Sequence, residues 1–396
     1  MTLERTTPVG VLGAGAMGAG IAQVAAARGH RVVLADADAR AVARGREGIA
    51  KSLAREVEKG RMGADVADAS LARISTADGT GDATLSEFRE CALVIEAIVE
   101  RLDVKREVFA QLERVVAPDA VLATNTSSLS IASIGAACAR KERVIGIHFF
   151  NPAPVMPLVE IVPSLATDPR VVDSARALVD AWGKTTVLAS DTPGFIVNRV
   201  ARPFYGEALR IHDERIASPA AIDHAMKTQG GFRMGPFELM DFIGLDVNYA
   251  VTESVFAATY YDPRYRPSLT QKRLVESGWL GRKTGRGFYD YAEGAARPEP
   301  ELDQALQDAI FDRVFAMLVN EAADAVLYGV ASARDVDLAV TKGVNYPKGL
   351  LAWGEEIGLE RIVTRLDELQ AEYGEDRYRA SALLRRVARA GGSFFS

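Results

Sequence analysis

The sequence predicts an α/β domain built on a parallel sheet, followed by two all-α repeat domains. A glycine-rich turn joins a strand to a helix near the start of the chain. Short apolar runs then alternate with helical patterns to about residue 189, as in a buried parallel sheet. The rest of the chain is helical and repeats itself at a fixed offset. We therefore expect domains at residues 1–189, 190–291 and 305–396.

The first element is a strand–turn–helix segment. An apolar strand is expected at residues 8–12 and an alanine-rich helix at residues 19–27. The glycines between them permit a tight turn, close approach of a pyrophosphate to backbone N–H groups, and close packing of helix on strand. A second strand, residues 31–35, ends at an acid. This sequence of elements within about 30 residues indicates a Rossmann-type dinucleotide-binding domain. The cofactor site is assigned to Gly13, Gly15, Met17 and Gly18.

The acid after the second strand is Asp36. Its carboxylate can accept hydrogen bonds from the adenine-ribose hydroxyls and would repel a 2′-phosphate, which favours NAD over NADP. Arg40 lies nearby, so NADP stays open on this argument.

Four further strands are expected, and the ends of these strands should bring cofactor and substrate together. They lie at residues 92–96, 121–124, 144–147 and 158–162. Between Ala37 and Asp78 the pattern predicts a long helical insertion. Residues 38–61 carry seven Lys or Arg against four Asp or Glu, which is a solvated helix face or a cationic binding surface.

Composition restricts the class of protein. The formal net charge of -6 argues against a general nucleic-acid binder. No apolar run approaches the roughly 18 residues that a membrane span needs. Cys91 and Cys138 form no CxxC and are expected to be small buried residues, with the cytoplasm as the simplest compartment. We expect no metal site.

One histidine has the setting of a catalytic base. His148 ends an apolar strand, and Glu160 lies inside the next one, where an unpaired carboxylate is costly. A carboxylate that stabilises a protonated histidine is a standard general-base arrangement. The alternative is a structural strand-end histidine with Glu160 facing solvent. His30, His212 and His224 are expected at the surface.

Several motifs together resemble the 3-hydroxyacyl-CoA dehydrogenase family, over residues 8 to 291. They are Asn125-Thr126-Ser127-Ser128-Leu129, His148-Phe149-Phe150-Asn151-Pro152, Leu158-Val159-Glu160, Asp191-Thr192-Pro193-Gly194-Phe195-Ile196-Val197-Asn198-Arg199, Gly235-Pro236-Phe237-Glu238-Leu239 and Lys283-Thr284-Gly285. The related 3-hydroxyisobutyrate and 6-phosphogluconate dehydrogenases look different at the catalytic positions.

The resemblance implies NAD-dependent oxidation of an (S)-3-hydroxyacyl-CoA to the 3-ketoacyl-CoA. It implies that His148 is the base, that Glu160 is its partner, and that Ser127 and Asn198 contact the reacting oxygen or hold His148. The positions that it assigns to NAD are Glu100, Lys105, Asn125, Asn151 and Lys283. The positions that it assigns to CoA are Ser52 and Lys59.

Two other functions compete with this one. The first is an NAD-dependent dehydrogenase of a free hydroxy acid or sugar acid, and the second is a non-catalytic NAD-binding structural protein. The motifs leave the acyl chain open, including a terminal carboxylate as in 3-hydroxyadipyl-CoA.

The helical half is an internal repeat at an offset of 114. Arg199 returns as Arg313 and Glu207 as Glu321, with residues 292–300 as a linker. Asn198 is replaced by Asp312, and Lys283 has no counterpart, so the second copy should keep the fold without the chemistry. We expect the two copies to pack on each other within one chain, with homo-oligomers possible through other surfaces.

Overall fold

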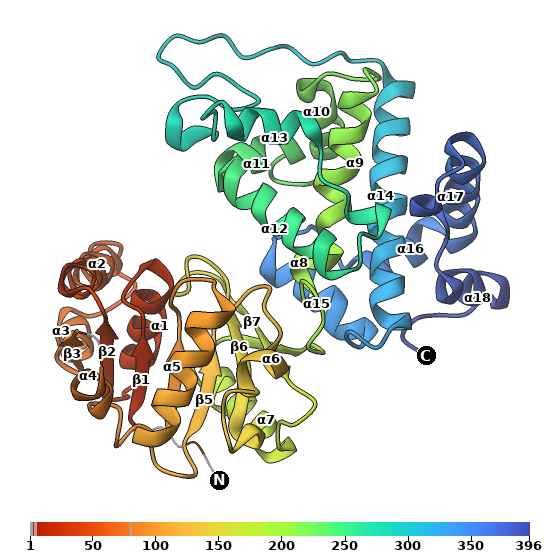
Figure 1. The fold of residues 1–396 in the computed structure, drawn as a ribbon. Coiled ribbons are helices and arrows are strands. Elements are labelled where there is room, and N and C mark those ends of the chain that lie inside the picture. The colour runs from red at the N-terminus through yellow and green to blue at the C-terminus, as the bar shows by residue number, and fades with distance from the viewer. Residues whose placement is uncertain (1–2, 4–5, 80) are drawn as a thin grey trace. The chain divides into compact units, whose positions relative to one another are not determined.

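The computed structural model describes residue 3, residues 6–79 and residues 81–396. It divides into two compact units, Met1–Thr192 and Pro193–Ser396 (Figure 1). The first unit is α/β and the second is helical, as predicted. Among the described residues, no helix has the length and apolar character needed to cross a membrane.

The described part of the first unit forms an eight-stranded sheet in the order β3-β2-β1-β4-β5-β6-β7-β8. Its strands are β1 (Val9–Leu12), β2 (Val32–Asp36), β3 (Ile74–Asp78), β4 (Leu93–Glu96), β5 (Val121–Thr124), β6 (Val144–Phe149), β7 (Leu158–Pro163) and β8 (Thr185–Leu188). The prediction of a parallel sheet is wrong for β6 and β7, which pair antiparallel. Their connection, residues 150–157, is shorter than the dozen or more residues that a parallel crossover needs.

Two strands, β3 and β8, were not predicted from the sequence. The expected helical insertion ends in β3, an edge strand whose Ser75 and Thr76 are exposed. The other is β8, which pairs with β7 at the opposite edge. Edge strands are short and partly polar, so they lack the continuous apolar run that marks a central strand.

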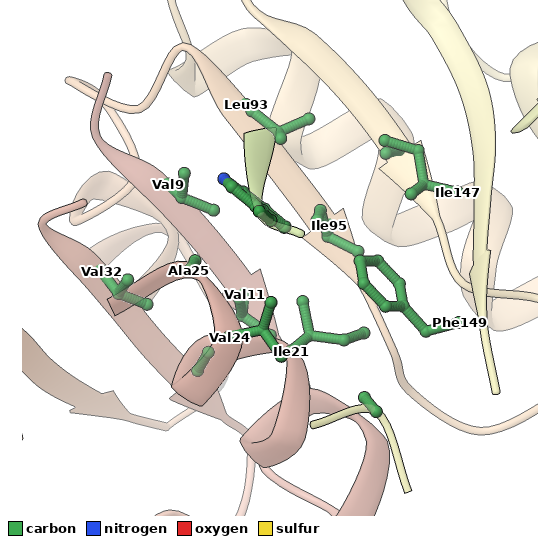
Figure 2. Packing of buried hydrophobic residues seen from close by; sticks show 14 of the residues in the cluster. Val9, Val11, Ile21, Val24, Ala25, Val32, Leu93, Ile95, Ile147 and Phe149 are labelled. Atoms are coloured by element: carbon green, nitrogen blue, oxygen red, sulfur yellow. The ribbon is translucent and has the colours of Figure 1, made fainter. Parts of the chain in front are cut away.

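Helices join these strands and pack on them. They are α1 (Ala16–Ala27), α2 (Ala39–Glu58), α3 (Ala64–Ala72), α4 (Asp82–Ser86), α5 (Leu102–Val115), α6 (Ile131–Gly135) and α7 (Pro169–Ala181), with a 3-10 turn at Lys141–Arg143. Figure 2 shows Ile21 and Val24 of α1 in the same core as Val11 of β1. Full burial of each such side chain stabilises the fold by about 1.5–3 kcal/mol. Cys91 and Cys138 are also buried, as predicted.

The expectation that His30 lies at the surface is wrong, because this residue is only 1% exposed. Its Nε2 accepts a hydrogen bond of 2.9 Å from the indole N–H of Trp182. An indole can only donate, so the proton of the neutral ring lies on Nδ1, which donates to the carbonyl of Thr7 at 2.8 Å. Burial lowers the pKa of His30 and favours this neutral form. The partner is 152 residues away in sequence, beyond the reach of local pattern.

Helices dominate the second unit. Those of the first copy are α8 (Val197–Val200), α9 (Arg202–Asp213), α10 (Pro219–Thr228), α11 (Pro236–Ile243), α12 (Leu245–Ala258) and α13 (Leu269–Glu276). Those of the second copy are α14 (Gln304–Leu327), α15 (Ala333–Gly343), α16 (Leu350–Ile357), α17 (Leu359–Tyr373) and α18 (Ala382–Ala390). The expected linker lies in the helix-free segment 292–303 between them.

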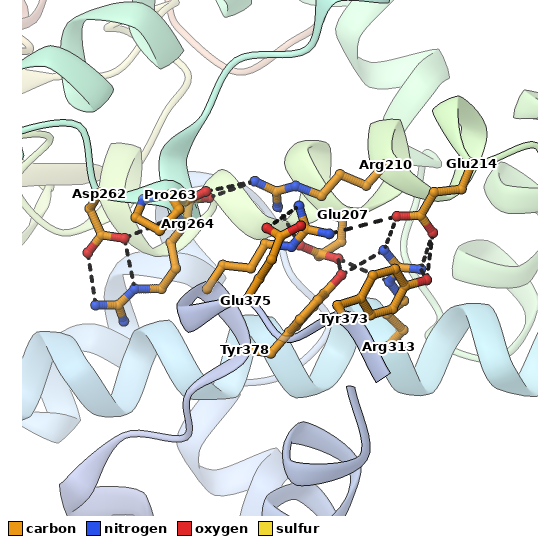
Figure 3. A network of polar contacts seen from close by, with 11 residues as sticks. Glu207, Arg210, Glu214, Asp262, Pro263, Arg264, Arg313, Tyr373, Glu375 and Tyr378 are labelled. Atoms are coloured by element: carbon orange, nitrogen blue, oxygen red, sulfur yellow. Dashed lines mark hydrogen bonds and ion pairs between the residues drawn. The ribbon is translucent and has the colours of Figure 1, made fainter. Parts of the chain in front are cut away.

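The two copies contact each other through reciprocal ion pairs. Nε of Arg199 donates to Glu321 at 2.7 Å, and Nε of Arg313 donates to Glu207 at 3.1 Å. Arg313 and Glu321 are the counterparts of Arg199 and Glu207 at the offset of 114. The arginine of each copy therefore pairs with the glutamate of the other copy. Figure 3 shows Glu207 and Arg313 within the larger polar network around this contact. Such reciprocity is the signature of a twofold contact.

Each copy also folds around the same aspartate. Asp223 accepts two backbone N–H groups at the start of α11, at 2.8 and 2.9 Å. Its counterpart Asp337 accepts two at the start of α16, at 2.8 and 2.9 Å. The first N–H groups of a helix have no partner within the helix, and both carboxylates supply one.

Candidate active site

The glycine turn between β1 and α1 is built for close approach. Gly13 has φ of 109°, a backbone conformation that favours glycine. A Cβ on Gly18 would lie 1.7 Å from the carbonyl oxygen of Gly13, so helix and turn pack too closely for a side chain. A Cβ on Gly15 would meet no heavy atom of the described residues within 4 Å. Gly15 precedes the helix N-terminus, which suits a pyrophosphate. Met17 is half-buried against the core.

Asp36 ties β2 to this turn. One carboxylate oxygen accepts the N–H of Ala14 at 2.7 Å, and the other accepts the N–H of Asp38 at 3.0 Å. The carboxylate therefore lies beside the turn, where a dinucleotide's ribose hydroxyls are bound in this fold. The residues present fit NAD at both the pyrophosphate and the ribose positions.

A buried charge cluster follows β4. The ammonium of Lys105 is 2.6 Å from Oε1 of Glu96 and 3.3 Å from Oε2 of Glu100. Lys105 is 1% exposed and Glu96 is 0% exposed, so each charge depends on the other for compensation. The assignment of Lys105 and Glu100 to NAD stays a prediction. Glu96 was not predicted as a site residue. It ends its apolar strand, whereas Glu160 lies inside one.

Glu100 also organises the loop after β5. Its Oε1 accepts the hydroxyl of Thr126 at 2.5 Å and the N–H of Ser127 at 3.0 Å. Burial raises the pKa of Glu100, but Lys105 and these hydrogen bonds outweigh it and hold the pKa below its usual value. The neighbouring Asn125 accepts the N–H of Phe149 at 2.8 Å, which joins this loop to the end of β6. The motif around Ser127 is thereby brought beside the strand that carries His148.

The predicted base and its partner meet directly. His148 and Glu160 are opposite each other in the antiparallel pair β6–β7, and Nδ1 of His148 lies 2.6 Å from Oε2 of Glu160. Their exposed fractions are 5% and 0%, so Glu160 does not face solvent. Since a carboxylate only accepts, Nδ1 carries the proton and Nε2 is the basic nitrogen. The antiparallel pairing of β6 and β7, which was not predicted, places the two residues opposite each other.

A cavity of about 350 Å³ lies between the glycine turn and α2. Its lining includes Gly15 and, along one face of α2, Arg44, Gly48 and Ser52. Lys59 is exposed at the end of α2, and its ammonium is 3.9 Å from Glu56. The structure thus places Ser52 in the cavity, Lys59 outside its lining, and adds Arg44, which the helical spacing to Ser52 could have indicated.

Other predicted site residues are placed separately. Asn151 is exposed after β6 in the first unit. Asn198 lies in α8 and is half-buried, within the helical unit. Lys283, in the same unit, pairs with Asp246 at 2.6 Å. Asp191, the first residue of the motif at residues 191–199, has a structural role, because it accepts two backbone N–H groups at the start of α6.

Known families match nearly the whole chain. The model described as 3-hydroxyacyl-CoA dehydrogenase, NAD binding domain matches residues 8–192, and the corresponding C-terminal domain model matches residues 194–291 and 310–393. The chain belongs to the 3-hydroxyacyl-CoA dehydrogenase family. It is thus an NAD-dependent 3-hydroxyacyl-CoA dehydrogenase, and the two competing functions are set aside.

Individual relatives agree with this assignment. The chain is 40% identical over 465 aligned residues to the 3-hydroxyadipyl-CoA dehydrogenase of Escherichia coli (strain K12), covering 96% of this chain and 97% of the relative. It is 44% identical to a probable 3-hydroxybutyryl-CoA dehydrogenase of Bacillus subtilis, covering 72% of this chain and 96% of the relative. A crystal structure of 3-hydroxybutyryl-CoA dehydrogenase from Escherichia coli K12 superposes with a TM-score of 0.91 at 39% identity, covering 98% of this chain and 99% of that one.

Proposed function

We propose that His148 is the general base of the dehydrogenase reaction and that Glu160 is its positioning partner. The observation that carries the proposal is the buried contact of 2.6 Å between Nδ1 of His148 and Glu160. It fixes the tautomer that leaves Nε2 basic. Nε2 takes the proton from the 3-hydroxyl, and the carboxylate stabilises the positive charge that then develops on the ring. In the reverse direction the protonated ring donates to the 3-keto oxygen.

The other site residues are proposed to bind and orient. NAD, when bound, would accept the hydride that leaves C3 of the substrate. Ser127 and Asn198 contact the reacting oxygen or hold His148. On the cofactor side, the glycine turn holds the pyrophosphate and Asp36 holds the adenine ribose. The remaining residues proposed for the cofactor are Glu100, Lys105, Asn125, Asn151 and Lys283.

CoA is proposed to bind at α2. Ser52 lines the cavity beside the glycine turn, and Lys59 is the residue that directly follows α2. CoA carries a 3′-phosphate and a pyrophosphate, and a lysine offers a point charge to either. The excess of Lys and Arg over Asp and Glu in residues 38–61 supports the assignment of the CoA phosphates to this surface.

We further propose that the second helical copy replaces a partner subunit. The reciprocal pairs Arg199–Glu321 and Arg313–Glu207 support this proposal. A partner tethered through a short linker has an effective concentration on the order of millimolar, which exceeds ordinary protein concentrations. The second copy then acts as a support for the first.

His148→Gln tests the proposal. Loss of a general base typically lowers kcat by about 10²–10⁴-fold. NADH binding, measured by fluorescence titration, should stay near the wild-type value because Asp36 and the glycine turn are untouched. His224→Gln, at a half-buried histidine of the helical unit, is the matched control. Near-normal turnover of the His148 variant would remove His148 as the base.

A further inference from the structure

The helical unit contains a second cavity, and none of the residues assigned above to the dehydrogenase reaction lines it. It has a volume of about 190 Å³ and lies along one face of α9, against residues 264–271. Its lining is rich in arginine. The five are Arg202, Arg210, Arg264, Arg266 and Arg377.

Three of these arginines are neutralised by carboxylates. Arg210 pairs with Glu207, Arg264 pairs with Asp262, Glu321 and Asp324, and Arg377 pairs with Glu214 and Glu375. The ion pairs found among the described residues do not include Arg202 or Arg266.

Among the residues that line the cavity, arginines outnumber carboxylates. Asp213 is the one carboxylate in the described lining, and it accepts hydrogen bonds from the hydroxyls of Ser268 and Thr270. Arg202 and Arg266, which take part in none of the ion pairs found among the described residues, thus share the lining with one carboxylate that is already hydrogen-bonded.

Arg202 is the unusual member because it is buried. It is 7% exposed, and its polar contacts are neutral: Nη1 donates to Oγ1 of Thr252 at 3.2 Å and to the carbonyl of Asn248 at 3.5 Å. Its guanidinium lies over the ring of Tyr205, 4.9 Å from the centroid. Its Nε has no hydrogen-bond partner among the described residues. A buried cation without an anionic partner is costly, and burial accordingly lowers the pKa of Arg202.

The repeat shows that the fold does not need this charge. At the offset of 114 the second copy has Ala316, which is buried at 2% exposure in α14. Both copies form the same reciprocal pairs on either side of this position. The arginine is therefore a feature of the first copy alone, which is also the copy that carries Asn198.

Arg202 lies one helical turn after Asn198. Ala201, between α8 and α9, has φ of -82° and ψ of -7°, so the backbone stays close to helical across the junction. Residues four apart on a helix are about 5–6 Å apart. Side chains one helical turn apart on the same face can therefore contact two groups of one ligand. Leu209 and Leu269 also line the cavity and provide apolar walls for the chain.

We propose that Arg202 forms a carboxylate-binding subsite, which takes the carboxylate at the far end of the acyl chain in a dicarboxylic 3-hydroxyacyl-CoA. The inference rests on the proposed role of Asn198 at the reacting oxygen. A carboxylate supplies the anionic acceptor that a guanidinium binds with its planar set of donors, and that Arg202 lacks among the described residues. The same chemistry could come from a free dicarboxylate, so the test separates the two sources.

The test compares two CoA esters of equal length. NADH oxidation by the full-length chain is measured with 3-ketoadipyl-CoA and with 3-ketohexanoyl-CoA, which ends in a methyl group. A hydrogen bond to a charged group contributes enough for about a 10- to 100-fold preference in kcat/KM for the carboxylated ester. Arg202→Gln should remove most of this preference. Arg202→Ala, which copies the residue of the second repeat, gives the same readout if the glutamine variant does not fold.

A control and a second arm decide the interpretation. Arg386→Gln makes the same change of charge at an exposed arginine of α18 and should keep the wild-type preference. Equal losses on both esters in the Arg202 variants would make Arg202 structural and overturn the proposal, as would a wild type without preference. Thermal stabilisation by free adipate that depends on Arg202, without discrimination between esters, would assign the carboxylate to a free ligand and overturn the substrate subsite. Absence of turnover with both esters in the wild type would instead contradict the dehydrogenase function.

Discussion

Glu160→Gln is the sharpest test of the proposed chemistry. The substitution keeps the size of the side chain and removes its charge. In the structure, Glu160 is 0% exposed and its carboxylate is 2.6 Å from Nδ1 of His148. The side-chain oxygen of glutamine can still accept a hydrogen bond from the Nδ1–H group, so the position of the ring should change little. What is lost is the attraction between the carboxylate and the positive ring that forms during proton transfer.

The size of the loss follows from this geometry. A hydrogen bond between charged partners contributes about 1.5–3 kcal/mol, and two unit charges about 4 Å apart interact by about 4 kcal/mol at an effective dielectric constant of 20. A loss of about 2–4 kcal/mol in the transition state lowers kcat by about 30- to 1,000-fold. KM for the CoA ester should change little, because Ser52 and the α2 surface are unaltered.

The assay is steady-state NADH oxidation with a 3-ketoacyl-CoA, supported by circular dichroism to verify folding. Glu142→Gln, at an exposed carboxylate of the same unit, is the matched control and should match the wild type. If folded Glu160→Gln kept a kcat within about threefold of the wild type, the reasoning from the buried pair would be refuted.

Three further predictions concern cofactor, substrate and assembly. Asp36→Ala should lower the preference for NAD over NADP, because it removes repulsion of the 2′-phosphate; equal use of both by the wild type would contradict the assignment. Lys59→Ala should raise KM for a full CoA ester more than for a pantetheine ester, which lacks the 3′-phosphate and pyrophosphate, and equal effects would place Lys59 elsewhere. Deletion after Tyr291 should yield a protein that dimerises through the newly exposed face or precipitates, as seen by light scattering, whereas a stable, fully active monomer would argue against intrachain pairing.

Local patterns predicted most of the first unit. The glycine turn, the central strands and the acid at the end of the second strand are each recognisable from a short stretch of sequence, so they could be predicted. The antiparallel β6–β7 pair and the edge strands β3 and β8 were missed because strand direction and edge position depend on which segments meet across the sheet. Antiparallel pairing could have been inferred from the short connection at residues 150–157.

The candidate site was predictable where a costly residue type stood out. Glu160, an acid inside an apolar strand, signalled a partner, and His148 lies opposite it. Glu96 gives a weaker signal, because it ends its strand, and it was not predicted. His30 could not be placed, because its burial depends on Trp182, far along the chain. Arg202 gave no signal, since an arginine at the start of an amphipathic helix is normally exposed; only its three-dimensional surroundings distinguish it.

The internal repeat serves as a comparison that the chain carries within itself. Arg199 and Glu207 recur as Arg313 and Glu321, and each pair closes across the contact between the copies. These positions have the same structural role in both copies. Loss of either partner would leave a buried charge unpaired and lower the free energy of unfolding by about 3–5 kcal/mol. Selection for the fold alone is enough to explain why they are the same.

Positions that differ between the copies have a different explanation. In the second copy, Asp312 stands where the first has Asn198, and it pairs at the surface with Arg361 at 2.7 Å. Such an exposed pair contributes about 0–1 kcal/mol, so the helix tolerates either residue. Ala316 likewise fills the place of Arg202 at no cost in charge burial. Because the helix accommodates Asp312 at the first position and Ala316 at the second, neither Asn198 nor Arg202 is required by the shared fold, which agrees with the proposed roles of both residues in binding the substrate. Binding and orientation of the substrate is the role that their positions one helical turn apart support.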